Sequence, residues 1–101
     1  MRALERANLV RLARAELKRA IARGETDASE VVSECPWETE SMTIAELLTS
    51  QRRWGRTRAR KFLMPLSLSE NKQLGTLTSR QRQLLANELA ARAAGRQTLA
   101  A

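Results

Sequence analysis

The sequence predicts an all-α protein in which a long N-terminal helix packs on a compact helical body. Glycine and proline are rare, with four and two residues among 101, while Ala, Leu, Arg, Gln and Glu are abundant, and this composition favours helix throughout. At three places a Thr or Asp precedes a Glu or Gln by three positions, which is the spacing of a helix start. A chain of this length forms one domain with a modest core, packed by Leu, Ala, Ile and Val because aromatic residues make up only 3%.

The charge of the chain favours a polyanionic partner. The net charge is +7 and the sequence pI is about 11.2. Only three of the eighteen basic residues are lysines, and arginine binds phosphate through two parallel hydrogen bonds where lysine acts as a point charge. Residues 25–50 hold seven acidic and no basic residues, whereas residues 51–63 hold six basic and no acidic ones. Such sorting predicts faces with different roles, and we expect the acidic one to face solvent, away from the polyanionic partner.

The sequence lacks the residues that several classes of function require. The single cysteine, Cys35, cannot form an internal disulfide, and without any histidine a zinc site and a Ser or Cys catalytic triad lose their usual groups. We therefore expect no metal, no other cofactor and no enzymatic activity. No apolar run approaches the length of a membrane span, and the N-terminus lacks an apolar signal core, so we expect no membrane contact and a cytoplasmic location.

The N-terminal segment, residues 1–24, predicts one long helix over Leu4–Arg23, whose first turns either fray or extend as an arm. Gly24 follows it as a typical C-terminal cap. One face of this helix is apolar and consists of Val10, Ala13, Leu17, Ala20 and Ile21. Another face carries three cations at helical spacing: Arg11, Arg14 and Lys18. These cations form either a solvated face or a DNA contact, and the pattern leaves both open.

The helical body is predicted over residues 25–95. Asp27 with Glu30 opens a short helix that runs to about Cys35, and Pro36 stops it. We expect Cys35 to be a small buried hydrophobic residue and Trp37 to dock on the core.

The stretch 43–63 predicts two short helices joined by a tight basic turn. Thr43 and Glu46 have the spacing of a reciprocal capping box, and Gly55 supplies the backbone freedom that a tight reversal needs. A second helical pattern begins directly after Gly55. Backbone N–H groups at a helix N-terminus are unpaired and bind anions. Four arginines surround this helix start: Arg52, Arg53, Arg56 and Arg58. The stretch is therefore predicted to be a phosphate clamp.

The remainder predicts a loop and a last helix. Met64 and Pro65 end the preceding helix, and Leu66–Leu77 is predicted to be a loop or partial turn. Thr78 with Gln81 opens a helix over about Ser79–Ala93, which Gly95 closes. Residues 96–101 are expected to be disordered. The pattern places Leu84, Leu85, Leu89 and Ala93 inward and Arg80, Arg82 and Arg92 outward.

Three pieces of the chain, in order and spacing, resemble the actinobacterial integration host factor family. They are RLARAELKRAI at 11–21, SMTIAELLTSQRRWGRTRARKFL at 41–63 and LGTLTSRQRQLL at 74–85. The resemblance implies a long N-terminal helix on a body that contains a helix-two-turns-helix motif, here at 43–63. It also implies a nucleoid-associated protein that binds duplex DNA with little sequence preference, bends or compacts it and assists site-specific recombination.

The resemblance also implies where DNA is contacted. The family's DNA turn falls on Gln51–Thr57, where this chain has Arg52-Arg53-Trp54 in place of the usual Pro-Gly and aliphatic residue. A second, Arg-rich patch falls on Asn71–Gly75, where only Lys72 is basic and Arg80 and Arg82 could compensate. The candidate DNA-binding residues are Arg52, Arg53, Trp54, Gly55, Arg56, Thr57, Arg58, Lys61, Lys72, Arg80, Arg11, Arg14 and Lys18.

Trp54 has two interpretations. As a wedge it would enter between base steps and kink the duplex, and as a plug it would fix the turn on Phe62 and Leu48. We favour the plug. The sequence thus predicts a monomeric, non-enzymatic protein of the nucleoid that clamps the phosphate backbone of double-stranded DNA. The alternative is an RNA-binding or ribosome-associated protein that uses the same clamp.

Overall fold

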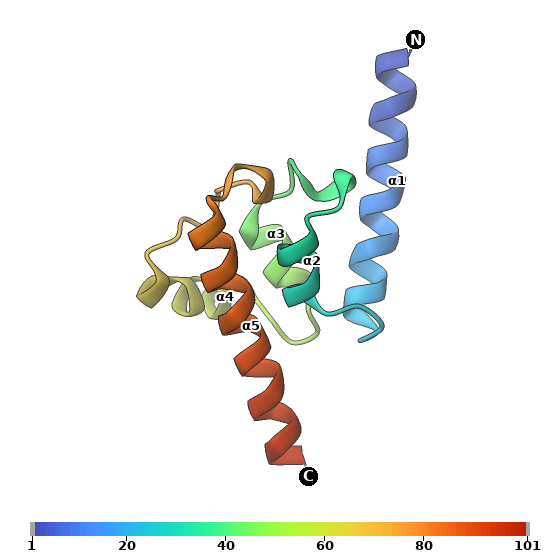
Figure 1. The fold of residues 1–101 in the computed structure, drawn as a ribbon. Helices are drawn as coiled ribbons and strands as arrows, with labels where there is room; N and C mark the ends of the chain where they lie inside the picture. The colour runs from blue at the N-terminus through green and yellow to red at the C-terminus, as the bar shows by residue number, and fades with distance from the viewer. Residues whose placement is uncertain (1, 101) are drawn as a thin grey trace.

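Five α-helices and three short 3-10 helices make up the computed structural model, which describes the backbone of residues 2–100 and the side chains of residues 3–93. The α-helices are α1 (Arg2–Ala22), α2 (Ala28–Glu34), α3 (Ile44–Ser50), α4 (Arg56–Leu63) and α5 (Ser79–Ala100). The 3-10 helices are η1 (Trp37–Thr39), η2 (Met64–Leu66) and η3 (Leu74–Thr76). Figure 1 shows α2 and α3 at the centre, with the outer halves of α1 and α5 extending beyond the body at opposite ends. The predicted all-α class is confirmed.

The core forms around α3. Ile44, Leu47 and Leu48 recur at helical spacing and are fully buried, and they meet buried side chains of α2, α4 and α5. From α1 only Ile21 is fully part of this core, with Leu17 packed against its edge. The N-terminal half of α1 stands clear of the body and leaves three leucines exposed: Leu4, Leu9 and Leu12. No helix within residues 2–100 is both long and apolar enough to cross a membrane.

The predicted helix ends are largely confirmed. Gly24 has φ +78°, and the N–H groups of Gly24 and Glu25 donate to the carbonyls of Ile21 and Ala20 at 3.0 and 2.9 Å, which is the Schellman arrangement at the end of α1. At the start of α5 the capping box is complete. The N–H of Gln81 donates to Thr78 Oγ1 at 3.1 Å, and the N–H of Thr78 donates to Gln81 Oε1 at 3.0 Å.

The other two predicted boxes are incomplete. Thr43 Oγ1 accepts from the N–H of Glu46 at 3.1 Å, but the Glu46 carboxylate turns away to α1. Asp27 occupies the cap position of α2 without a side-chain hydrogen bond.

Residues 66–77, for which the sequence predicted a loop or partial turn, include η3 and form a lid over α3. Leu68, Leu74 and Leu77 are buried in the core. The N–H groups of Ile44 and Ala45, which have no partner within α3, donate to carbonyls of residues 72 and 70 at 2.9 Å each. Gly75 is required here, since a Cβ at this position would lie 2.8 Å from the Glu40 carbonyl oxygen.

Several predicted orientations are wrong. Trp37 is 49% exposed, because Thr39 is the buried residue of η1 and Trp37 lies on a different face of that turn. Leu84 is 39% exposed, because α5 buries the face of Leu85 and Leu89. Ala93 is exposed on α5, one turn beyond the buried Leu89.

The structure also differs from the expectations for Cys35 and for the end of the last helix. Cys35 is half-buried, with φ 44° at the end of α2. The last helix does not close at Gly95 and continues to Ala100, since its alanine-rich surroundings outweigh the helix cost of about 1 kcal/mol for one glycine. The side chains of the predicted disordered tail, 96–101, lie outside the described residues.

Arg82 is a structural residue, although the sequence placed it on the outer face of the last helix. Its Nη1 donates to the Val32 carbonyl at 2.9 Å, and its Nη2 donates to the Leu74 carbonyl at 2.8 Å. One guanidinium therefore joins α5 to α2 and to η3. Arg82 is half-buried and its two outer nitrogens each donate to a backbone carbonyl, so its main role is in the fold and not in the second predicted patch.

Candidate nucleic-acid interface

The turn between α3 and α4 reverses the chain at Arg53. Arg53 has φ +69°, in the left-handed region, whereas Gly55 has φ −94° and ψ −179°. The prediction that Gly55 supplies the special backbone freedom is therefore wrong. Gly55 is an extended N-cap, and the N–H of Trp54 closes the turn by donating to the Gln51 carbonyl at 3.2 Å. Arg52 and Arg53 are both exposed at the corner.

Trp54 anchors this turn to the body. Its side chain is only 4% exposed and packs edge-to-face on Phe62, with 5.3 Å between the ring centroids. The plug interpretation is confirmed, and Trp54 is withdrawn from the candidate contact residues because a buried ring cannot enter a base step. Its burial holds the exposed arginines on either side at fixed positions.

The start of α4 is open to a ligand. Gly55, Arg56 and Thr57 are exposed, and a Cβ placed on Gly55 would meet no atom within 4 Å. No side chain caps the helix, so its first N–H groups point outward without an internal acceptor. An anion could approach these N–H groups closely, because the cap residue has no side chain in the way.

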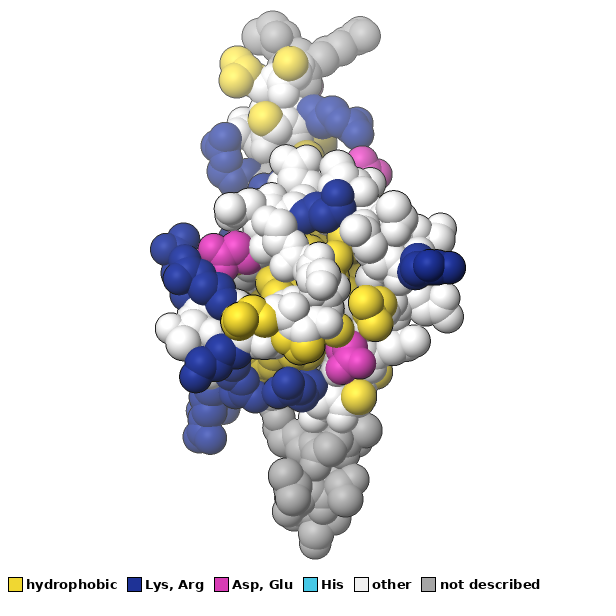
Figure 2. Space-filling view, turned by 90° about the vertical axis from the view of Figure 1, so that its left-hand side faces the viewer, with side chains coloured by type: hydrophobic (Ala, Val, Ile, Leu, Met, Phe, Trp, Pro, Cys, Tyr) yellow, Lys and Arg dark blue, Asp and Glu magenta, His cyan; other side chains and the backbone are white. Residues whose placement is uncertain are grey.

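The cations around this helix start are largely unpaired. Among the described residues only Arg60 of the basic block 51–63 contacts a carboxylate, with Nε 2.9 Å from Glu70 Oε2. That hydrogen bond, helped by the charges of Arg60 and Arg56, lowers the pKa of the Glu70 carboxyl. The remaining cations of the block are exposed and available: Arg52, Arg53, Arg56, Arg58 and Lys61. Figure 2 views the side of the body that carries α4, where Lys and Arg side chains gather along the left and lower edges.

The cations of α1 have a different environment from the one predicted. Arg14 Nε donates to the Glu38 carbonyl at 2.9 Å, its Nη2 contacts Ser41, and Lys18 Nζ lies 3.6 Å from Glu46. Arg14 and Lys18 flank the buried stripe of α1, so their side chains reach down to the body. They dock α1 on α3 and η1, and Glu46 serves this docking instead of facing solvent. Arg11 remains exposed.

The second predicted patch lies apart from the turn. Lys72 is half-buried in the lid and Arg80 is exposed in the first turn of α5. In Figure 1 this end of α5 is at the top of the body, while the α3–α4 turn is at the bottom. The structure therefore does not bring Lys72 and Arg80 together with the arginines of the turn.

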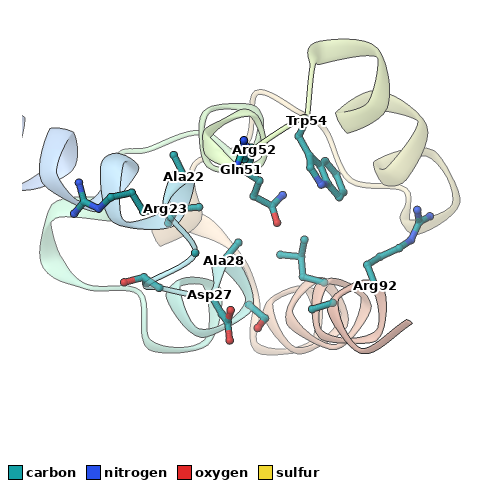
Figure 3. A pocket seen from close by; sticks show the side chains of 14 residues that line it. Ala22, Arg23, Asp27, Ala28, Gln51, Arg52, Trp54 and Arg92 are labelled. Carbon is teal, nitrogen blue, oxygen red and sulfur yellow. The ribbon is translucent and has the colours of Figure 1, made fainter. Parts of the chain in front are cut away.

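Sequence reasoning missed the position of Arg92. A cavity of about 290 Å³ lies behind the turn. Figure 3 shows Trp54 and Gln51 on one side of it, Arg92 extending from α5 and Arg23 pointing away. The Arg92 guanidinium lies 5.2 Å from the centroid of the Phe62 ring, so α5 reaches the side of α4. The signal was present in the sequence, because Arg92 follows the inward residues Leu85 and Leu89 at helical spacing.

Comparisons with known proteins agree with this architecture. No family model matches the chain. The chain is 33% identical over 87 residues to the integration host factor of Mycolicibacterium smegmatis (strain ATCC 700084 / mc(2)155), covering 82% of this chain and 81% of that protein. The solved structure of sIHF bound to an 8-bp palindromic DNA superposes with a TM-score of 0.74 at 28% identity, covering 84% of this chain and 98% of that one. With this identity and coverage, the chain belongs to the integration host factor family.

Proposed function

We propose that the protein is a nucleoid-associated protein that binds duplex DNA through the phosphate backbone. The observation that carries this proposal is the uncapped start of α4, which is surrounded by exposed arginines without carboxylate partners among the described residues. Helix N–H groups and guanidinium forks both bind phosphate anions through charge-assisted hydrogen bonds. The relative's name and the DNA in the neighbouring structure support the same partner.

Binding at this site is largely independent of base sequence. The exposed side chains of the turn are arginines at a helix start, and the helix behind it is eight residues long and buries its other face through Ala59, Phe62 and Leu63. Contacts to phosphate position a protein on the duplex without reading bases, and they make affinity strongly dependent on salt.

The same protein bends the DNA it binds, by engaging it at two places. The turn and the patch of Lys72 and Arg80 lie at opposite ends of the body, and Arg11 is exposed on α1. We infer that one duplex engages both ends by curving around the body. Bending a site of about 20–30 base pairs by about 40–90° costs on the order of 1–6 kcal/mol, which a few added phosphate contacts offset. A bent duplex would bring distant sites together, as assistance to recombination requires.

The test is a mobility shift with duplex DNA and RNA of equal length across a range of salt concentrations. With about four to six phosphates neutralised, we expect a log–log salt slope of about −4 to −5. Arg56→Ala should weaken binding by about tenfold or more without changing the melting temperature. A flat salt response would refute the phosphate clamp, and tighter binding to RNA would favour the RNA-associated alternative. Energy transfer between labelled duplex ends tests bending, which an unchanged end-to-end distance at saturation would exclude.

A further inference from the structure

A groove runs between α4 and α5, beside the proposed DNA turn. It has a volume of about 630 Å³, and residues of the α4 start, of the exposed side of α4 and of α5 line it: Gly55, Thr57, Arg58, Lys61, Phe62 and Arg92. Gly55 and Thr57 belong both to the helix start and to this groove. The groove is thus a continuation of the open anion site, and Arg92 contributes to it from the neighbouring helix.

Two guanidinium groups of the groove rest on an aromatic pair. The Arg58 guanidinium carbon lies 4.5 Å from the Trp54 ring centroid, and that of Arg92 lies 5.2 Å from the Phe62 ring centroid. The two rings pack edge-to-face on each other. A guanidinium that lies over a ring keeps its N–H edge free to donate. The aromatic pair therefore orients two arginines from different helices while leaving their donors unused.

The groove carries a concentrated positive charge. Three of its six lining residues are cations, none is acidic, and in the described part of the chain none of these cations lies within ion-pair distance of a carboxylate. Three like charges around one hollow repel one another, and a bound anion removes that repulsion. An extended polyanion fits better than a single small ion, because the cations are distributed over two helices.

We propose that this groove holds the phosphate backbone of the nucleic acid, so that the contact which begins at the start of α4 continues onto α5 through Arg92. The inference rests on the proposed function. It adds a binding residue, Arg92, and a second helix to the contact surface.

The experiment compares three variants of the full chain by fluorescence anisotropy with a labelled duplex at several salt concentrations. Arg92→Gln removes the charge, Arg92→Lys retains it, and Arg19→Gln is a control with the same charge change on the outer face of α1, where Arg19 pairs with Glu16. We expect Arg92→Gln to weaken binding by about tenfold at low salt and to reduce the salt slope by about 0.9. Arg92→Lys should bind within about threefold of the wild type, since a lysine still neutralises one phosphate. Arg19→Gln should also bind within about threefold of the wild type, because Arg19 does not line the groove.

The outcomes separate this inference from the proposed function. If the wild type binds duplex with the expected slope but Arg92→Gln binds equally well, α5 takes no part and the groove proposal fails alone. If the wild type does not bind duplex at all, the proposed function fails. A lower melting temperature for Arg92→Gln with an unchanged salt slope would assign Arg92 to stability only, and it would equally overturn the groove proposal.

Discussion

Replacing Arg53 with glycine separates the stability of the turn from its binding. Arg53 has φ +69°, a conformation that costs an L-residue about 1–2 kcal/mol. Glycine adopts this conformation freely but loses more chain entropy on folding, by about 0.5–1 kcal/mol. Arg53→Gly should therefore leave the free energy of unfolding unchanged or raise it by about 1 kcal/mol.

The same substitution, Arg53→Gly, should lower the affinity for duplex DNA. Arg53 is exposed at the corner and contacts no carboxylate among the described residues, so its guanidinium is available to a phosphate. Loss of one charge-assisted hydrogen-bonded contact costs about 1.5–3 kcal/mol, which corresponds to about a 10- to 100-fold weaker Kd at low salt.

Thermal melting and fluorescence anisotropy measure the two effects on the same samples. For a domain of this size about 1 kcal/mol corresponds to about 4–8 °C, so Tm should stay constant or rise by a few degrees. Arg53→Ala is the matched control, because it loses the charge and keeps the backbone conformation. It should bind as weakly as Arg53→Gly without any gain in Tm. A fall in Tm for Arg53→Gly, or a Kd equal to that of the wild type, would refute the reasoning.

Two further predictions concern residues that the sequence pattern misplaced or ignored. Arg82→Ala should lower the free energy of unfolding by about 2–4 kcal/mol, because it removes two hydrogen bonds to the carbonyls of Val32 and Leu74. Denaturant titration measures this change, and Arg80→Ala is the exposed control. A loss of stability no larger than that of the control would contradict the prediction. Glu70→Gln should tighten binding to duplex DNA a few-fold and steepen the salt slope by up to about 0.9. The substitution releases Arg60 and removes a carboxylate next to the basic block 51–63. An unchanged affinity would show that Arg60 does not contact the DNA.

The helix starts could be predicted because they follow local rules. Thr43 and Thr78 cap helices by hydrogen bonds that span three residues, so the printed sequence contains all that is needed. The environments of the two tryptophans do not follow from such local rules: the burial favoured for Trp54 is confirmed, but the docking predicted for Trp37 is wrong. Trp54 is buried and Trp37 exposed because of which neighbours surround them in three dimensions, and helical spacing does not contain that information.

The candidate site shows the same division between local and distant determinants. The arginine cluster and its place at a helix start follow from consecutive residues. The conformation of the turn was not predicted: Trp54 packs on Phe62 eight residues further along the chain, Gly55 is extended, and the left-handed residue is Arg53. The roles of Arg82 and Arg92 depend on groups 50 and 30 positions earlier in the chain, the Val32 carbonyl and the Phe62 ring.

The ion pairs give the sorted charges of the chain a structural meaning. Cations of α1 contact carboxylates: Glu46 holds Arg14 and Lys18, and Glu16 holds Arg19. Such exposed pairs contribute only about 0–1 kcal/mol each to stability, but every pair reduces the positive potential around α1. The basic block 51–63 has one carboxylate partner among the described residues, so most of its positive charge is not offset by a neighbouring carboxylate. We therefore expect a polyanion to approach the turn first, and we propose that the distribution of carboxylates, rather than base contacts, sets the orientation of the bound protein.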